Sequence, residues 1–135
     1  MRQHWRFDPR ASEASDRVRS EIRHALEAHA REDAIVRLDI IYAEIVSNAI
    51  RHAPGTLELR VECEANGGDV LLHVMDRGPG YHVNSKLPPD IFSETGRGLF
   101  IISMHADHFF VEQRTGGGSH ARILLKALAV LAGER

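Results

Sequence analysis

The sequence predicts an α/β sandwich in which helices pack on one face of a mainly antiparallel, mixed sheet. The 135-residue chain alternates between segments with helical spacing of apolar residues and segments with strict two-residue alternation. These segments follow the order strand, two helices, two strands, a long irregular stretch, a helix and two strands. We therefore expect residues 1–135 to form a single domain around one hydrophobic core.

The first strand and the first helix are expected near the N-terminus. Trp5 and Phe7 alternate with charged residues, which is typical of a short strand. Residues 12–30 then show apolar positions three and four residues apart, which predicts a helix. Ser12 or Ser15 is the expected N-cap, because a hydroxyl at that position accepts a bond from an unpaired backbone N–H.

A second helix and a hairpin follow. Residues 34–53 carry a continuous apolar stripe, and Pro54 ends the helix because proline cannot continue its hydrogen bonds. Residues 57–63 alternate between apolar and charged side chains, which predicts a strand with one solvated face. Residues 70–75 are apolar on both faces except for His73, so this partner strand is expected at a more central place in the sheet.

The C-terminal part begins with an irregular stretch. Residues 76–96 are rich in Gly, Pro and polar types, and a loop of this length in so short a chain is usually functional or mobile. Helical spacing resumes over 98–106, and two strands are expected near 109–113 and 121–125. A short tail helix is expected at 126–132.

Composition excludes several classes of protein. Seventeen Lys and Arg stand against 19 Asp and Glu, and the formal net charge of −2 argues against a nucleic-acid partner. Cys63 is the single cysteine, so the chain forms no internal disulfide framework. No apolar run approaches the roughly 20 residues that span a bilayer, and the N-terminus lacks the apolar segment of a secretion signal. We expect a cytoplasmic protein with no membrane partner.

The second helix carries polar side chains in a pattern suited to chemistry. Glu44 and Asn48 are four residues apart, so they share one face of a helix, and His52 continues the stripe one turn later. An amide oxygen is a suitable ligand for Mg²⁺, which takes few protein ligands and keeps water and phosphate oxygens. Glu44 can accept a proton from an attacking hydroxyl. The alternative is a polar, solvated helix face, which the apolar neighbours of both residues disfavour.

Two glycine-containing segments follow. Asp76 ends a buried strand and is followed by Gly78 and Gly80, so its carboxylate can accept a hydrogen bond from an amine of a flat ligand. An ordinary turn is the alternative reading. Gly96-Arg97-Gly98-Leu99 precedes a helix, whose N-terminus suits phosphate, although a glycine-rich helix entry without a ligand is equally compatible. Neither segment is a P-loop or a dinucleotide-binding motif.

Four segments together resemble the motifs of the GHKL ATPase superfamily, which includes gyrase, histidine-kinase catalytic domains and anti-sigma-factor kinases. Residues 44–53 (EIVSNAIRHA) resemble its N box, and residues 76–80 (DRGPG) resemble its first glycine box. Residues 96–99 (GRGL) are similar to the second glycine box, and residues 118–123 (GSHARI) to the last motif. All four occur in the order that the family shows.

The resemblance implies a role for each matched residue. Glu44 would be the general base, Asn48 would ligate Mg²⁺, and His52 would lie with them at the nucleotide. Asp76 would bind the adenine amino group of ATP. Gly78 and Gly80 would shape the pocket. The phosphates would be cradled, beneath a lid at 81–95, by Gly96, Arg97, Gly98 and Leu99. Ser119 would support adenine.

The chain is most similar in extent to the small, stand-alone serine-protein kinases of this superfamily. The resemblance implies an ATP-dependent protein serine kinase that acts as an anti-sigma factor or partner-switching regulator. Its partners would be a small anti-sigma-factor antagonist (a sulfate-transporter-like, STAS-like domain), a sigma factor and a second copy of the chain. Two alternatives stay open: a nucleotide-switched binding module without kinase activity, and the catalytic domain of a histidine kinase supplied in trans.

Overall fold

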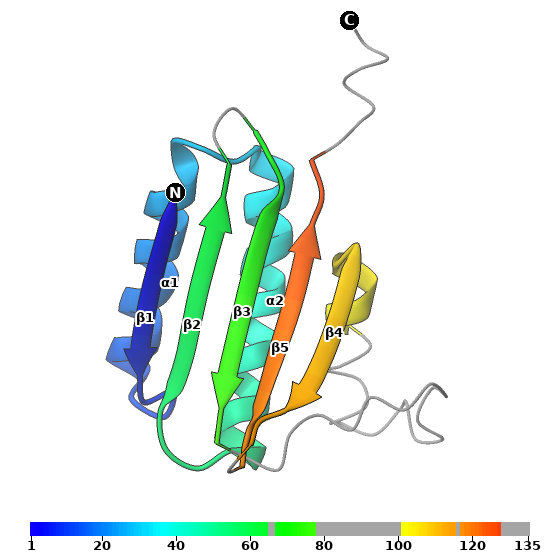
Figure 1. Ribbon diagram of the computed structural model, residues 1–135. Coiled ribbons are helices and arrows are strands. Elements are labelled where there is room, and N and C mark those ends of the chain that lie inside the picture. The colour runs from blue at the N-terminus through cyan, green and yellow to red at the C-terminus, as the bar shows by residue number, and fades with distance from the viewer. Residues whose placement is uncertain (65–66, 78–100, 116, 128–135) are drawn as a thin grey trace, which may run out of the picture.

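The structure is a computed structural model that describes residues 1–64, 67–77, 101–115 and 117–127. Its elements follow the order that the sequence predicts (Figure 1). The strands are β1 (Arg2–Phe7), β2 (Leu57–Cys63), β3 (Val70–Asp76), β4 (His108–Gln113) and β5 (Ser119–Leu125), and the helices are α1 (Ser12–Glu27) and α2 (Glu32–His52). Residues 101–105 form a further helical segment, inside the helix expected over 98–106.

The five strands form one sheet with the order β1-β2-β3-β5-β4. Each of the four neighbouring pairs is antiparallel, so the described strands contain none of the parallel pairing that a mixed sheet would include. β2 and β3 are direct neighbours, as the predicted hairpin requires, and β3 lies at the centre of the sheet. The expected α/β sandwich with a mainly antiparallel sheet is confirmed.

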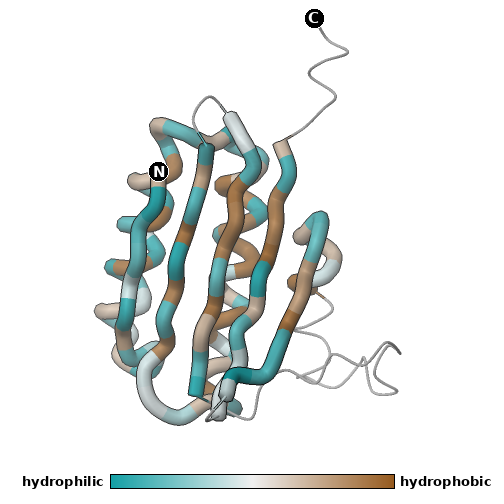
Figure 2. Tube along the Cα trace, in the orientation of Figure 1, coloured by the Kyte–Doolittle hydropathy of each residue, from teal (hydrophilic) through white to brown (hydrophobic). Residues whose placement is uncertain are grey.

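Both α1 and α2 cover the same face of the sheet, and neither lies on the opposite face (Figure 1). Apolar and polar residues alternate along β2, as Figure 2 shows. Alternate strand residues therefore enter the core between the two layers. The largest side chains that are fully buried there come from both helices, from β2, β3 and β5, and from the 101–105 segment: Leu26, Leu38, Ile41, Ile45, Leu57, Leu59, Leu72, Ile102, Ile123 and Leu125.

The beginning of α1 differs from the expected capping. Ala11 is the N-cap without a side-chain hydrogen bond, and Ser12 is already the first helical residue. Ser15 is buried, and its hydroxyl donates to the carbonyl oxygen of Pro9 over 2.9 Å. The prediction of a Ser12 or Ser15 cap is therefore wrong, because Ser15 uses its hydroxyl to attach the helix to the turn before it.

Polar contacts hold the two helices together, and an aromatic contact joins α2 to β1. Tyr42 of α2 donates its hydroxyl proton to the carbonyl oxygen of Ser15 over 2.7 Å, and burial raises its pKa to about 12. Arg19 of α1 donates two hydrogen bonds, of 2.6 and 2.8 Å, to the carboxylate of Asp39. These bonds lower the pKa of Asp39. The ring of Phe7 stacks on Tyr42 with a centroid distance of 6.4 Å, which joins β1 to the helix layer.

Element ends differ slightly from the expected ones. α1 ends at Glu27 instead of residue 30, and α2 begins at Glu32 instead of residue 34. Residues 126–127 are not helical, and the remainder of the expected tail helix lies outside the described residues. Within the described ranges, no helix combines the length and the apolar character that crossing a bilayer requires.

Candidate functional site

The first half of the candidate site lies where β3 ends and β5 begins. Asp76 is the last residue of β3 and is 4% exposed. Ser119 is the first residue of β5, is fully buried, and donates from Oγ to Asp76 Oδ2 over 2.9 Å. The two residues are direct partners in the antiparallel register. Strand pairing thus joins two predicted adenine contacts that are 43 positions apart in the sequence.

The turn before β5 packs tightly against the same strand end. Gly118 has φ +85°, and a Cβ placed on it would lie 2.0 Å from the carbonyl oxygen of Asp76 and 3.0 Å from Cα of Arg77. Only glycine fits this approach, because any side chain would displace the neighbouring backbone. Arg114 Nη1 donates to the same Asp76 carbonyl oxygen over 3.5 Å. The end of β3 is therefore held by both the turn and the strand that follow it.

The second half of the candidate site is the C-terminal part of α2. Asn48 is 2% exposed and continues the buried stripe of Ile41 and Ile45, so its amide lies between the helix and the sheet. Glu44 is half-buried one turn earlier on the helix, as the four-residue spacing requires. Its carboxylate makes no hydrogen bond or ion pair with the part of the chain that the structure describes. His52, the last residue of α2, is exposed.

The amide of Asn48 is satisfied on one side only. Arg51 Nη2 donates to Asn48 Oδ1 over 2.9 Å. The amide nitrogen Nδ2 is buried and has no hydrogen-bond partner among the described residues. A buried donor without a partner costs about 1–3 kcal/mol, so native structures retain few of them. The unused N–H of Asn48 therefore indicates a place where a ligand oxygen can bind.

Arg10, which lies near the N-terminus, holds the C-terminal part of α2 in place. The guanidinium of Arg10 donates to the carbonyl oxygens of Ala49, Ala53 and Gly55, the first at 3.4 Å and the last at 3.2 Å. A cation at a helix C-terminus satisfies its free carbonyl groups and complements the helix dipole. Arg10 thereby positions the turn of α2 that follows Asn48.

The two halves lie at the same end of the molecule. α2 ends beside the end of β3 and the beginning of β5 (Figure 1). The connection after α2 approaches the residue after Asp76, since a Cβ on Gly55 would lie 3.9 Å from Cδ of Arg77. Both Asn48 and Asp76 belong to the buried layer between helices and sheet. The structure thus pairs Asp76 directly with Ser119, and the C-terminal part of α2, which carries Glu44 and Asn48, ends at the same end of the molecule.

These groups fit a magnesium nucleotide. Asp76 is a buried acceptor that suits an exocyclic amine, and the free N–H of Asn48 suits a phosphate oxygen. The Asn48 carbonyl oxygen is a hard ligand that can exchange Arg51 for Mg²⁺. In the described part of the chain, no three His, Cys, Asp or Glu side chains are arranged to hold a metal. Mg²⁺ does not need such a cluster, because it keeps water and phosphate ligands.

The remaining predicted residues lie outside the described part of the chain. They are the two glycines of the first box, the four residues of the second box and the lid at 81–95: Gly78, Gly80, Gly96, Arg97, Gly98 and Leu99. Their roles stay predictions. The helical segment 101–105, which directly follows the second box in the sequence, is anchored by Ile102, whose side chain is 1% exposed.

A histidine pair that sequence reasoning did not single out lies on the uncovered face of the sheet. His73 Nδ1 and His120 Nε2 are 2.9 Å apart, and Glu62 Oε2 lies 3.2 Å from His73 Nε2. Burial lowers the pKa of both histidines, and the positive charge of Arg122 lowers each further. His120 follows Ser119 directly, so this pair crosses the same two strands as the Asp76–Ser119 hydrogen bond.

Sequence reasoning also missed Arg10 and Arg114, which hold the two halves of the site from outside it. Neither arginine lies in a recognisable motif, and each acts on backbone oxygens that are distant in the sequence. No local signal identifies such residues. Gly118 was included in the last motif, but the close approach that requires glycine there depends on the strand pairing.

Comparison with known proteins gives a family match over most of the chain. Residues 9–124 match the family described as "Histidine kinase-like ATPase domain". The chain is similar to the catalytic domain of the histidine kinase ThkA, with 18% identity, coverage of 93% of this chain and 96% of that one, and a TM-score of 0.48. No curated protein matches the chain.

Two further solved structures show similar values. The histidine kinase domain of a blue-light activated kinase from Erythrobacter litoralis is 18% identical, with 85% of this chain and 60% of that chain covered and a TM-score of 0.44. The mycobacterial sensor histidine kinase MprB is 17% identical, with 92% and 97% covered and a TM-score of 0.46. The match over residues 9–124 takes in both halves of the site, and the chain belongs to the histidine kinase-like ATPase domain family of the GHKL superfamily.

Proposed function

We propose that the protein is an ATP-dependent protein serine kinase that acts as an anti-sigma factor, or partner-switching regulator, by phosphorylating a serine of a small antagonist domain. One observation supports the proposal most strongly: the half-buried carboxylate of Glu44 has no partner in the described chain, one turn from the free amide N–H of Asn48. A proton acceptor next to a phosphate-binding donor is the arrangement that phosphoryl transfer to a hydroxyl requires.

The proposed reaction follows from this arrangement. Glu44 accepts the proton of the substrate serine hydroxyl while the serine oxygen attacks the γ-phosphorus of ATP. The bond between the γ-phosphorus and the bridging oxygen breaks, and its electron pair leaves with ADP. Asn48 donates its free N–H to a phosphate oxygen and offers its carbonyl oxygen to the metal. Bound Mg²⁺ supplies the positive charge that offsets the charge of the phosphates.

The Asp76–Ser119 pair supplies selectivity for adenine. The Ser119 hydroxyl donates to the Asp76 carboxylate and orients it, and a carboxylate can accept more than one hydrogen bond. The amino group of adenine can donate to it, whereas guanine presents a carbonyl oxygen at the corresponding position. A buried site of this kind rejects a mismatched partner, because its polar groups are then left unpaired.

Serine as the acceptor rests on the resemblance to the stand-alone kinases and on the histidine contexts of the chain. A sensor histidine kinase carries its phosphoacceptor histidine on a dimerisation helix, where it is typically followed by Glu and then Thr-Pro or Asn-Pro. None of the nine histidines of the sequence is followed by Glu. We propose a STAS-like antagonist, a sigma factor and a second copy of the chain as partners.

The test is to incubate the protein with magnesium-ATP and a STAS-like antagonist encoded near its gene, and to map phosphate by mass spectrometry. Phosphoserine on the antagonist supports the proposal. ATP binding without transfer, together with sigma-factor capture that depends on ATP rather than ADP, would instead identify a nucleotide-switched binding module. Acid-labile phosphate on a histidine of a separate receptor would identify a histidine kinase domain that acts in trans.

A further inference from the structure

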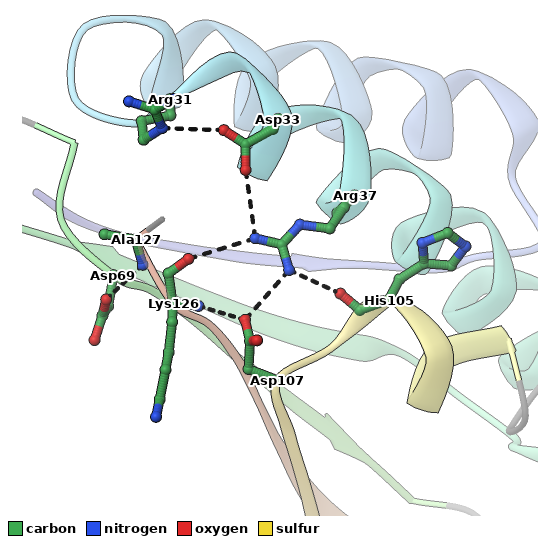
Figure 3. A network of polar contacts seen from close by, with 8 residues as sticks. All are labelled: Arg31, Asp33, Arg37, Asp69, His105, Asp107, Lys126 and Ala127. Atoms are coloured by element: carbon green, nitrogen blue, oxygen red, sulfur yellow. Dashed lines mark hydrogen bonds and ion pairs between the residues drawn. The ribbon is translucent and has the colours of Figure 1, made fainter. Parts of the chain in front are cut away.

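Arg37, in the first half of α2, connects three elements through its side chain (Figure 3). Nη1 donates to the carbonyl oxygen of His105 and to Oδ2 of Asp107, both over 3.2 Å. Nη2 donates to the carbonyl oxygen of Lys126 over 3.4 Å and lies 3.6 Å from the carboxylate of Asp33. One guanidinium therefore joins α2, the end of the 101–105 helix and the residue that follows β5.

The partners of Arg37 are fixed in turn. Asp107 Oδ2 also accepts the backbone N–H of Lys126 over 2.7 Å, and the backbone N–H of Asp107 donates to the carbonyl oxygen of Leu124 over 2.8 Å. The Lys126 N–H and then the Arg37 guanidinium lower the pKa of Asp107. The Arg37 side chain is 23% exposed and the Asp107 side chain 38%, so the hydrogen bond to the His105 carbonyl oxygen is partly buried while the others lie at the surface. The network is therefore a joint of several hydrogen bonds between the helix layer and the sheet.

The position of Arg37 on α2 relates this joint to the candidate site. At about 100° per residue, Arg37, Glu44 and Asn48 fall within an arc of about 40° on the helix surface. The same face of α2 thus holds the 101–105 helix at Arg37 and presents Glu44 and Asn48 further along. The second glycine box, Gly96–Leu99, directly precedes the 101–105 helix in the sequence.

Arg37 is remote from the atoms of the reaction and from the adenine contacts. It precedes Glu44 by seven residues and Asn48 by 11, which is about 10 Å and about 16 Å along a helix. Its partner Lys126 and the adenine contact Ser119 are at opposite ends of β5, separated by roughly 23 Å of extended chain. Any effect of Arg37 on nucleotide binding must therefore pass through the helix that it holds.

We infer that Arg37 is a positioning residue for the triphosphate part of the nucleotide. It holds the helix after the second glycine box at a set place against the face of α2 that carries Glu44 and Asn48. This inference rests on the proposed function, and it goes further by assigning triphosphate affinity, separately from adenine affinity, to a contact far from both. The Asp76–Ser119 pair does not depend on the joint, so adenine recognition stays unchanged without it.

The test compares Mg-ATP and adenosine by isothermal titration calorimetry of the full chain. Arg37→Met keeps the aliphatic stem and removes every donor. We expect ATP to bind about tenfold more weakly, which lies within the usual range for coupling between two distant sites of a protein. The affinity for adenosine should stay within a factor of about two of the wild-type value, a change smaller than coupling between sites usually produces. Arg37→Lys should recover part of the loss, since it keeps the charge without the planar fork.

Arg19→Met is the matched control. It removes a bidentate ion pair between α1 and α2, so its stability cost is comparable, but it leaves the 101–105 helix untouched. We expect it to change neither affinity. If Arg37→Met fails to fold, Asp107→Asn supplies the second variant, because it removes one of the two charged partners of Arg37 and leaves an oxygen for the Lys126 N–H.

Hydrogen exchange separates the possible failures. Without nucleotide, exchange of the amides at 101–107 should accelerate in Arg37→Met and stay at the wild-type rate in Arg19→Met. Unchanged exchange there, or equal weakening of ATP and adenosine, would overturn the inference. Unchanged ATP affinity in folded Arg37→Met and Asp107→Asn would overturn it as well. Wild-type protein that binds neither ligand would instead refute the proposed function itself.

Discussion

The two halves of the candidate site differ in how far the protein satisfies its own polar groups. In the strand half, the Asp76 carboxylate accepts from Ser119, and the backbone around it is held by Gly118 and Arg114. In the helix half, the Asn48 amide nitrogen has no partner within the described residues, and Glu44 lies half-buried without one. The first half is organised before any ligand arrives, whereas the second has unused hydrogen-bonding capacity.

This difference indicates how the two ends of a nucleotide are recognised. A rigid, hydrogen-bonded acceptor suits a flat base, whose donor has one position and one direction. Unused donors and acceptors suit phosphate, metal and an attacking hydroxyl, which bring several oxygens and change charge during the reaction. We therefore expect substitutions in the strand half to alter base affinity and substitutions in the helix half to alter turnover or metal dependence.

The largest expected effect is on turnover, and it concerns the helix half. Glu44→Gln keeps the size of the side chain but removes the proton acceptor, so phosphoryl transfer should fall about 100-fold to 10,000-fold. ATP affinity should stay near the wild-type value, because the amide adds no clash. Single-turnover transfer to the antagonist and calorimetric titration measure the two quantities. Full turnover in Glu44→Gln would exclude Glu44 as the base.

The next effect concerns the backbone that supports the strand half. Gly118→Ala places a methyl group against the Asp76 carbonyl oxygen at positive φ, and we expect a loss of about 3 kcal/mol in the free energy of unfolding. Gly117→Ala is the control, since Gly117 also has positive φ (+109°) but open space around it. It should cost about 1 kcal/mol. Urea denaturation that gives equal losses would contradict the proposed close approach.

A smaller effect is expected on adenosine affinity. Asp76→Asn keeps the acceptor for Ser119 but replaces one carboxylate oxygen with an amide NH2 group, a donor that faces the donor of the adenine amino group. Adenosine should bind about 10-fold to 100-fold more weakly, the usual cost of losing a hydrogen bond to a charged group. Circular dichroism should show an unchanged fold. Undiminished adenosine binding would remove Asp76 from base recognition.

The smallest expected effect is a pH dependence of stability from the opposite face of the sheet. The pKa values of His73 and His120 are lowered by burial, so the unfolded chain binds protons at a higher pH than the folded chain does. Stability from this pair is complete above the unfolded pKa of about 6.5 and decreases as the pH falls through it. Glu62 opposes this effect for His73, and Arg60 and Arg122 increase it.

A double variant isolates this contribution. His73→Gln/His120→Gln should show a flatter dependence of the urea midpoint on pH between about 7 and 5 than wild type does. His24→Gln/His105→Gln serves as the control because these side chains do not belong to the pair. Parallel pH profiles for wild type and the His73→Gln/His120→Gln variant would show that the pair does not control acid stability.

Sequence reasoning reached the elements of this fold because their signals are local. The alternation over residues 57–63 and the apolar stripe from Leu38 to Ala49 each report which face is buried. The cap of α1 was predicted wrongly, since the hydroxyl of Ser15 bonds to Pro9 instead of a free helix N–H. The local sequence pattern cannot distinguish a serine hydroxyl that caps a helix from one that bonds to the preceding turn.

Sequence reasoning could identify only part of the site, for a related reason. Glu44 and Asn48 are neighbours on one helix, so their shared face follows from their spacing. The contact between Asp76 and Ser119 depends on the pairing of β3 with β5, and the reach of Arg37 depends on the packing of three elements. Spacing along the chain carries no information on either, so only motif resemblance related Asp76 to Ser119, and nothing indicated Arg37.

The central claim is that one nucleotide is held by the helix half and the strand half together. The most direct measurement is calorimetric titration of ATP, with and without Mg²⁺, into wild type, Asn48→Ala and Asp76→Asn, with adenosine as a second ligand. We predict that Asn48→Ala loses the strengthening by Mg²⁺ but keeps adenosine affinity, while Asp76→Asn loses adenosine affinity but keeps the Mg²⁺ effect. Variants that change both quantities equally, or neither, would contradict a shared site.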